Sequence, residues 1–163
     1  MVTVLILAGG KSDRMGQDKA LMDGGVEHLR ALALDAEVER IITLCGDDNR
    51  IPLFEGEVWP DPPQCTSLRE VLEWVFGKIE GAIQLIPCDA FQLQRSGLEF
   101  LLNCDGGVPL DDRGNRLGLL GVCRGEWTPT LSGRDVSSLF SNLQDLDAGK
   151  LTGQMKNFNT PLD

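Results

Sequence analysis

Residues 2–7 most constrain the fold of this chain, because they form a continuous apolar, β-branched run that leads into two glycines, Gly9 and Gly10. Such a run is typical of a strand that is buried on both faces, as in parallel sheets covered by helices on each side. Residues 40–45 have the same character, and residues 27–36 between the two runs carry apolar side chains at helical spacing. The three segments predict a βαβ unit with a right-handed crossover.

The rest of the chain continues this alternation of helices and strands. Ser67 and Glu70 form a capping box, which predicts the start of a helix. Residues 82–86 predict a short buried strand that leads to Asp89, and open α/β sheets bind ligands at the carboxyl ends of their strands. Hydrophobic spacing also predicts helices over residues 95–103 and 134–147, and neighbouring antiparallel strands over residues 107–110 and 117–124.

These elements together define the expected fold. Strands that alternate with helices predict an α/β protein, a three-layer α/β/α sandwich with a Rossmann-like, mostly parallel sheet. The length of 163 residues suits one domain, and the sequence has no internal repeat or long linker that would divide it. We therefore expect a single domain over residues 1–163.

The charge of the chain narrows the class of ligand. The formal net charge is −10, so nucleic acid and anionic membrane surfaces are repelled on average, and we expect neither as a partner. No apolar run is long enough to cross a bilayer, and the five cysteines are scattered without a Cys-x-x-Cys pair. These features predict a soluble, cytoplasmic protein with reduced thiols. Residues 1–20, by contrast, carry a net charge of +1.

The loop after the first strand carries this local positive charge. Gly9 and Gly10 let backbone N–H groups approach phosphate oxygens closely, and Arg14 and Lys19 follow them. The loop fits neither the Gly-x-Gly-x-x-Gly nor the Gly-x-x-x-x-Gly-Lys-Ser/Thr pattern, which argues against a dinucleotide-dependent dehydrogenase and a P-loop NTPase. We interpret it as a phosphate-binding loop of another kind, with a plain turn bearing solvated charges as the alternative.

Three motifs along the chain have counterparts in known enzymes. Residues 7–19 read Leu-Ala-Gly-Gly-Lys-Ser-Asp-Arg-Met-Gly-Gln-Asp-Lys, residues 87–89 read Pro-Cys-Asp, and residues 158–161 read Phe-Asn-Thr-Pro. In this order they resemble motifs of the nucleotide-sugar pyrophosphorylase superfamily, and within it those of the molybdenum cofactor guanylyltransferases. The resemblance implies a fold of the nucleotide-diphospho-sugar transferase type. It also implies Mg²⁺-dependent transfer of GMP from GTP to molybdopterin, with release of pyrophosphate.

The resemblance further implies the residues of an active site. Arg14, Lys19 and Asp89 are the expected catalytic residues, with Asp89 as the Mg²⁺ ligand. The expected nucleotide-binding residues are Leu7, Ala8, Gly9, Gly10, Lys11, Arg14, Met15, Gly16, Lys19, Asp61 and Asp89. Asn159 is either a further contact to metal or acceptor or an ordinary turn residue, and His28 is expected at the surface rather than as a base. The implied partners are GTP and molybdopterin as substrates, and a molybdoenzyme or cofactor-biosynthesis protein that docks on the enzyme.

One segment departs from the family pattern. The family has a Gly-Pro-Leu-Ala-Gly-like segment where residues 66–70 here read Thr-Ser-Leu-Arg-Glu. We therefore expect Arg69 and Glu70 to place bulk and charge where a substrate approaches the helix start. Two alternatives follow from this departure: another nucleotidyltransferase of the same fold, using CTP or GTP on a sugar phosphate or other phosphorylated acceptor, and a non-catalytic nucleotide-binding protein.

Overall fold

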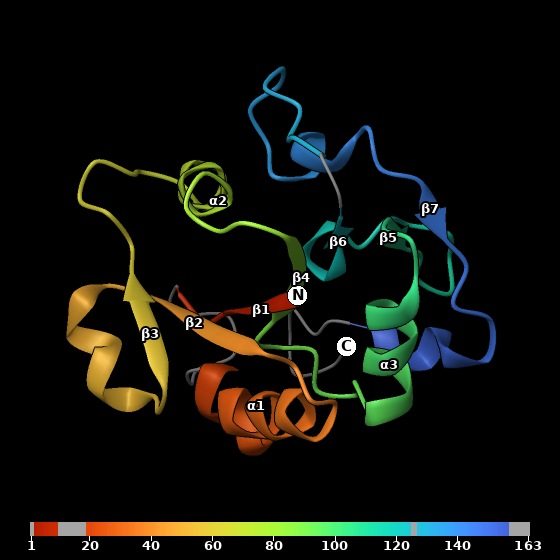
Figure 1. Ribbon diagram of the computed structural model, residues 1–163, viewed down its shortest axis with the longest axis horizontal. Helices are drawn as coiled ribbons and strands as arrows, with labels where there is room; N and C mark the ends of the chain where they lie inside the picture. Colours follow the sequence, from red (N-terminus) through yellow and green to blue (C-terminus); the bar gives the residue numbers. More distant parts are fainter. Residues whose placement is uncertain (1, 10–18, 125–126, 157–163) are drawn as a thin grey trace.

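A five-stranded sheet forms the centre of the protein. The computed structural model describes residues 2–9, 19–124 and 127–156, without the side chains of residues 19, 22 and 23. The strands lie in the order β3-β2-β1-β4-β6 (Figure 1). Their bounds are Val2–Leu7 for β1, Arg40–Gly46 for β2, Glu57–Pro60 for β3, Ala82–Pro87 for β4 and Val122–Cys123 for β6. All neighbouring strands run parallel except β6, which pairs antiparallel with β4, so the predicted mostly parallel sheet is confirmed.

Among the described residues, three α-helices cover the two faces of this sheet. Their bounds are Gly25–Asp35 for α1, Leu68–Phe76 for α2 and Arg95–Asn103 for α3. Helices α1 and α3 lie on one face and α2 lies on the other (Figure 1). Side chains of β1 alternate between the faces, because Val4 and Ile6 pack with α1 and α3 while Leu5 and Leu7 pack with α2. The predicted three-layer α/β/α fold is therefore confirmed.

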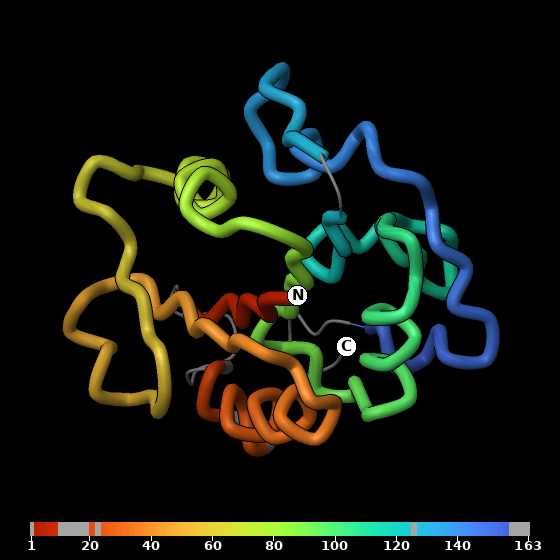
Figure 2. The backbone as a smooth tube through the Cα atoms, in the orientation of Figure 1, coloured from red at the N-terminus to blue at the C-terminus, as the bar shows by residue number. Residues whose placement is uncertain are grey.

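The chain after α3 has much less regular structure. Its described residues form two short strands besides β6, namely β5 at Val108–Pro109 and β7 at Asp145–Leu146, which pair parallel in a separate two-stranded sheet. This part of the chain runs along the β4 and β6 side of the molecule, opposite β3 (Figure 2). The described residues also form five 3₁₀-helices, Lys19–Gly24, Asp48–Leu53, Gly118–Leu120, Ser137–Phe140 and Gly149–Met155.

Of two sequence predictions for this part of the chain, one is wrong and one is confirmed in part. Residues 134–147 do not form one helix, because the chain makes a single 3₁₀ turn and then extends into β7. The apolar side chains of Leu139 and Phe140 still reach the core, so their spacing reflected burial without helical structure. The two expected antiparallel strands are confirmed in part, because the ranges contain the short strands β5 and β6 and contact each other through an antiparallel bridge between Gly107 and Val122. The main partner of β5 is β7, however, and that of β6 is β4. Within the described ranges, no helix is long and apolar enough to cross a membrane.

Candidate active site

The carboxyl ends of β1, β2 and β4 meet at one edge of the sheet. Leu7 of β1 stands in register with Leu44 of β2 on one side and with Pro87 of β4 on the other. The Ala8 N–H donates to the Leu44 carbonyl at 2.8 Å, and the Cys88 N–H donates to the Leu7 carbonyl at 3.0 Å. This pairing places the residues that follow each strand side by side, which is where open α/β sheets bind ligands.

A cavity of about 450 Å³ opens at this edge, on the α2 side of the sheet. Four of its lining residues are predicted site residues, Leu7, Gly9, Asp61 and Asp89. Its other lining residues come from the neighbouring strand ends, the start of α2 and the segment before β6: Leu44, Cys65, Thr66, Ser67, Leu68, Val71, Pro87, Cys88 and Leu119. The topology therefore gathers residues that lie more than 50 positions apart in the chain, such as Gly9 and Asp61, into one site.

Gly9 is required at its position by packing. A Cβ atom at this residue would lie 2.9 Å from the Cα of Gly46, closer than carbon atoms approach in proteins. Because Gly9 and Gly46 have no side chains, the backbone after β1 can pass directly against the end of β2. Ala8, the residue before, is 1% exposed and belongs to the core cluster beneath α1 rather than to the cavity wall.

Arg50 fixes the same two strand ends from the other side, a role that the sequence did not suggest. Its guanidinium donates to the carbonyl oxygens of Cys45 and Ala8, each at 2.8 Å, and lies over the ring of Phe54. Because Ala8 immediately precedes Gly9, Arg50 sets the direction in which the chain leaves β1. No local sequence signal could have identified it, since one of its acceptors lies 42 residues away.

Asp61 and Asp89 place two carboxylates on the same cavity. Asp89 lies in the turn after β4 and is 8% exposed, whereas Asp61 is exposed and its N–H donates to the Gly46 carbonyl at 2.7 Å. Partial burial of the carboxyl group raises the pKa of Asp61, and the nearby negative charge of Asp47 raises it further. Both carboxylates are hard oxygen ligands of the type that Mg²⁺ prefers.

The arrangement of these carboxylates suits a metal that is shared with a substrate. In the parts of the chain described by the structure, no group of three or more His, Cys, Asp or Glu side chains could hold a metal ion. Mg²⁺ in phosphate-transfer sites, however, binds through one or two carboxylates and otherwise through substrate phosphates and water. Asp89 at the strand end, with Asp61 on the same cavity, fits that mode of binding.

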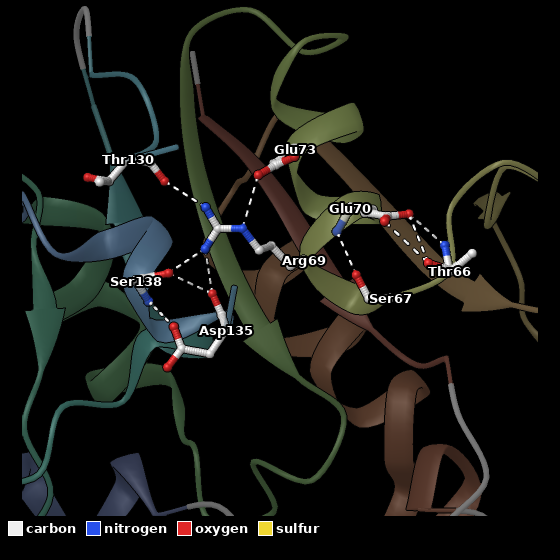
Figure 3. A network of polar contacts seen from close by, with 8 residues as sticks. All are labelled: Thr66, Ser67, Arg69, Glu70, Glu73, Thr130, Asp135 and Ser138. Atoms are coloured by element: carbon white, nitrogen blue, oxygen red, sulfur yellow. Dashed lines mark hydrogen bonds and ion pairs between the residues drawn. The ribbon is translucent and has the colours of Figure 1, made fainter. Parts of the chain in front are cut away.

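Arg69 and Glu70 at the start of α2 do not place bulk and charge in the path of a substrate, contrary to the expectation from the sequence. Neither side chain lines the cavity. Arg69 is 7% exposed and turns away from it, donating to Thr130 O at 2.8 Å and Asp135 O at 2.6 Å and pairing with Glu73 (Figure 3). The Glu70 N–H donates to Ser67 Oγ, as the predicted capping box requires, while the Glu70 carboxylate accepts from the N–H of Thr66, the residue before the N-cap. The bulk and charge of the two residues are therefore used in packing and capping, and do not fill the site.

The structure describes only a few of the remaining predicted residues. Lys19 begins the 3₁₀-helix before α1, and its side chain is not among those described. His28 is exposed on α1 and lines a different hollow, which agrees with the expectation of a surface residue. The other predicted residues fall outside the described residues: Gly10, Lys11, Arg14, Met15, Gly16 and Asn159.

Comparison with known proteins places this architecture in a family. The sequence profile of the MobA-like NTP transferase domain matches residues 4–154. A search of curated proteins finds no match. Among solved structures, an Aquifex aeolicus VF5 protein superposes with a TM-score of 0.73 at 18% identity, over 97% of this chain and 93% of that one.

Two further solved structures share the fold. Molybdopterin-guanine dinucleotide biosynthesis protein A from Archaeoglobus fulgidus has a TM-score of 0.69 at 17% identity, over 98% of this chain and 93% of that chain. The 4-diphosphocytidyl-2C-methyl-D-erythritol synthase of Anaerococcus prevotii has a TM-score of 0.59 at 9% identity, over 99% and 94%. At these identities the structural likeness establishes the fold, and the profile match establishes the family. The chain is therefore a nucleotidyltransferase that belongs to the family of the MobA-like NTP transferase domain.

Proposed function

We propose that the protein transfers GMP from GTP to molybdopterin, with Mg²⁺, and releases pyrophosphate. The observation that carries the proposal is the cavity at the strand ends, where Gly9, Asp61 and Asp89 come together. The motifs of the sequence, which resemble those of the molybdenum cofactor guanylyltransferases, support guanylyl transfer to this acceptor over other reactions of enzymes with this fold.

The proposed reaction is an in-line attack by the acceptor phosphate on the α-phosphorus of GTP. Asp89 would hold Mg²⁺, with Asp61 able to contribute from the same cavity, and the metal would neutralise charge on the phosphates. Arg14, Lys19 and the amides of the glycine loop would bind the triphosphate, and Arg50 would hold the start of that loop in place. No covalent intermediate is needed, because these groups act by positioning the substrates and stabilising charge.

Nucleotide binding is the first experiment. Calorimetric titration with GTP, CTP and ATP, each with and without Mg²⁺, is expected to give Mg²⁺-dependent binding of GTP. Asp89→Asn and Lys19→Ala are expected to weaken it at least tenfold, as loss of a charged contact to the nucleotide implies. Asp112→Asn and Lys78→Ala, both at exposed positions outside the cavity, are the matched controls. Binding of none of the three nucleotides contradicts the proposal, and selective binding of CTP indicates another transferase of the family.

The acceptor requires a second measurement. Pyrophosphate release from GTP is expected to depend on added molybdopterin and to be lost in Asp89→Asn. If the protein binds GTP with Mg²⁺ but molybdopterin gives no release above background, the acceptor assignment is wrong and the nucleotide assignment stands. A panel of sugar phosphates under the same conditions then tests the other acceptor class.

A further inference from the structure

Gln84 is a buried polar side chain in the middle of β4 that the proposed mechanism does not use. It is 0% exposed, and its Oε1 has no hydrogen-bond partner among the described residues, which costs stability. Its Nε2 donates to the carbonyl oxygens of Leu120 at 3.1 Å and Gly121 at 3.5 Å, and to that of the adjacent Leu85 at 2.8 Å. The bonds to Leu120 and Gly121 join β4 to the segment before β6, which an apolar side chain could not do.

The Leu120 carbonyl belongs to the 3₁₀ turn Gly118–Leu120, which comes just before β6. Successive side chains of this turn lie on opposite faces of the sheet. Leu119 packs against the cluster on the α2 face, and Leu120 is buried in the cluster on the α1 and α3 face. Leu119 also lines the candidate active-site cavity. The position of the turn against β4 therefore sets where this wall of the cavity stands.

Gln84 is the only side chain in the described part of the chain that donates to a carbonyl of this turn. The ring of Phe140 contacts the other end of the turn, where a Cβ at Gly118 would lie 3.1 Å from it. The backbone ladder reaches only the next residue, where Gly121 O accepts from β4 at 3.1 Å. Without Gln84, the buried Leu120 carbonyl would lose its partner, and the turn would shift to regain one.

We propose that Gln84 is a positioning residue, which fixes Leu119 as a wall of the cavity and thereby sets the affinity for the acceptor. The inference rests on the proposed function, since it names the substrate that this wall meets. In the order β1-β4-β6, Gly9 follows β1 and Asp89 follows β4, and β6 is antiparallel, so the turn before it lies at the same edge (Figure 1). The turn thus lies beyond Asp89 from the glycine loop, on the side left for the acceptor.

Gln84→Leu tests this role, because leucine fills a similar space without donating a hydrogen bond. We expect the KM for molybdopterin to rise about tenfold, with kcat within about twofold of the wild-type value and the affinity for GTP with Mg²⁺ unchanged. A KM equal to that of the wild type overturns the proposal. An equal loss of GTP affinity also overturns it, because the variant would then have damaged the whole site.

Thr43→Val is the matched control for Gln84→Leu. Thr43 is also 0% exposed in the sheet, and its Oγ1 also has no hydrogen-bond partner among the described residues. It lies in β2, which β1 separates from β4. Loss of a buried polar group at this position should leave both KM and kcat unchanged. A rise in KM equal to that in Gln84→Leu would overturn the proposal, since any buried polar group of the sheet would then have the same effect.

Gln84→Glu separates hydrogen bonding from packing. A neutral glutamate has the shape of glutamine and donates one O–H, and burial keeps a carboxyl group protonated to higher pH than in water. The KM for molybdopterin relative to wild type is therefore expected to be near one in the acidic range, and to rise if the carboxyl group ionises. A ratio as high as that of Gln84→Leu at every pH overturns the proposal, because a restored donor would then not restore the affinity.

Hydrogen exchange measures the turn without any substrate. The Leu120 and Gly121 amides donate to carbonyls at the start of the turn, each at 2.9 Å. In Gln84→Leu they should exchange about tenfold faster, while amides of β1 and α2 stay unchanged. Unchanged exchange of these two amides overturns the proposal whatever the activity. If the wild type transfers no GMP to molybdopterin, the proposed function is wrong, and the exchange result alone decides whether Gln84 positions the cavity wall.

Discussion

The two regions of the molecule are held together in different ways. In the sheet region, residues 2–103, strands of four to seven residues satisfy each other's backbone groups through parallel ladders. In the wrapping region, residues 104–156, the strands are two residues long and side chains bind many of the backbone carbonyls. The donors to these carbonyls include Arg69, Arg116, Asn142 and Gln144.

This difference follows from the need of every backbone polar group for a partner. Where strands are long, neighbouring strands meet this need and one side chain can change without loss of the ladder. Where strands are short, a single arginine holds several carbonyl groups, so its loss releases a whole segment. We therefore expect core substitutions in the sheet region to act on the whole fold. Substitutions of the bridging arginines should act mainly on the wrapping region.

The largest effect is expected from Leu85→Ala in β4. Leu85 is 0% exposed in the central part of the sheet and packs in the cluster beneath α2. Its truncation removes apolar contacts and leaves a cavity, which costs about 2–5 kcal/mol of unfolding free energy. Urea denaturation measures this cost. Leu34→Ala, at a position that is 59% exposed on α1, is the control and should change stability little; equal costs for the two variants contradict the role assigned to β4.

A smaller and more local effect is expected from Arg69→Met. Methionine keeps the apolar stem but removes the bonds to Thr130, Asp135 and Ser138 and the pair with Glu73. Hydrogen bonds from a charged group each contribute about 1.5–3 kcal/mol, so the wrapping region loses a large part of its attachment to α2. Hydrogen exchange should accelerate over residues 127–140.

The control for this prediction is Arg95→Met on α3. Arg95 forms an exposed pair with Glu99 and binds no carbonyl of the wrapping region, so exchange over residues 127–140 should stay unchanged. If Arg69→Met leaves that exchange unchanged as well, the segment is attached by its apolar contacts alone. If exchange instead accelerates equally in β1 and β4, Arg69 stabilises the whole fold and the contrast between the two regions fails.

Arg116→Met tests the same principle inside the wrapping region. The Arg116 guanidinium donates to Phe140 O at 2.7 Å and Leu143 O at 3.0 Å, and it pairs with Asp145. Its side chain is 36% exposed, so we expect a loss of about 1–2 kcal/mol, less than for the buried Arg69. Asp145→Asn removes the charge partner and leaves the carbonyl bonds, and should cost less still. Hydrogen exchange over residues 140–146 distinguishes the two variants; an equal effect assigns the stabilisation to the ion pair.

The same difference explains how much of the fold could be predicted from the sequence. The strand β1 and the helix α3 were predicted with their observed bounds, because continuous apolar runs and helical spacing reflect local structure. The strand β3 was missed, since it is a four-residue edge strand that ends in Pro60. Residues 134–147 were predicted wrongly because bonds from Arg116 and pairing with β5 decide their path, and both depend on residues distant in the sequence.

Some residues at the candidate site could likewise be predicted from the sequence, and others could not. Gly9, Asp61 and Asp89 follow strands, so parallel topology brings them to one cavity as the sequence implied. Arg50 was missed because its role depends on carbonyl groups of two other strand ends. The direction of Arg69 was predicted wrongly, since the sequence of α2 gives no information on which neighbouring segment offers it hydrogen-bond acceptors.

The smallest effect on stability is expected for an ion pair between two strands whose backbones already pair with each other. Arg40 of β2 and Glu57 of β3 form an ion pair at 2.7 Å, with side chains 41% and 38% exposed. The Arg40 hydrogen bond lowers the pKa of Glu57 below the usual value of a glutamate. The ion pair therefore stabilises the fold fully at pH values above the usual pKa of a glutamate. Its contribution is lost as the pH falls through the lowered pKa of the folded state.

Glu57→Gln should therefore cost only about 0–1 kcal/mol at neutral pH, because exposed pairs are screened by solvent. Denaturation of both proteins across the acidic range should show the difference shrinking as Glu57 becomes protonated in the folded wild type. A cost at neutral pH as large as that of Arg69→Met would mean that the edge of the sheet, like the wrapping region, depends on side chains. The parallel ladder of β2 and β3 argues against this, since it pairs the backbone of the edge strand whether or not Glu57 is charged.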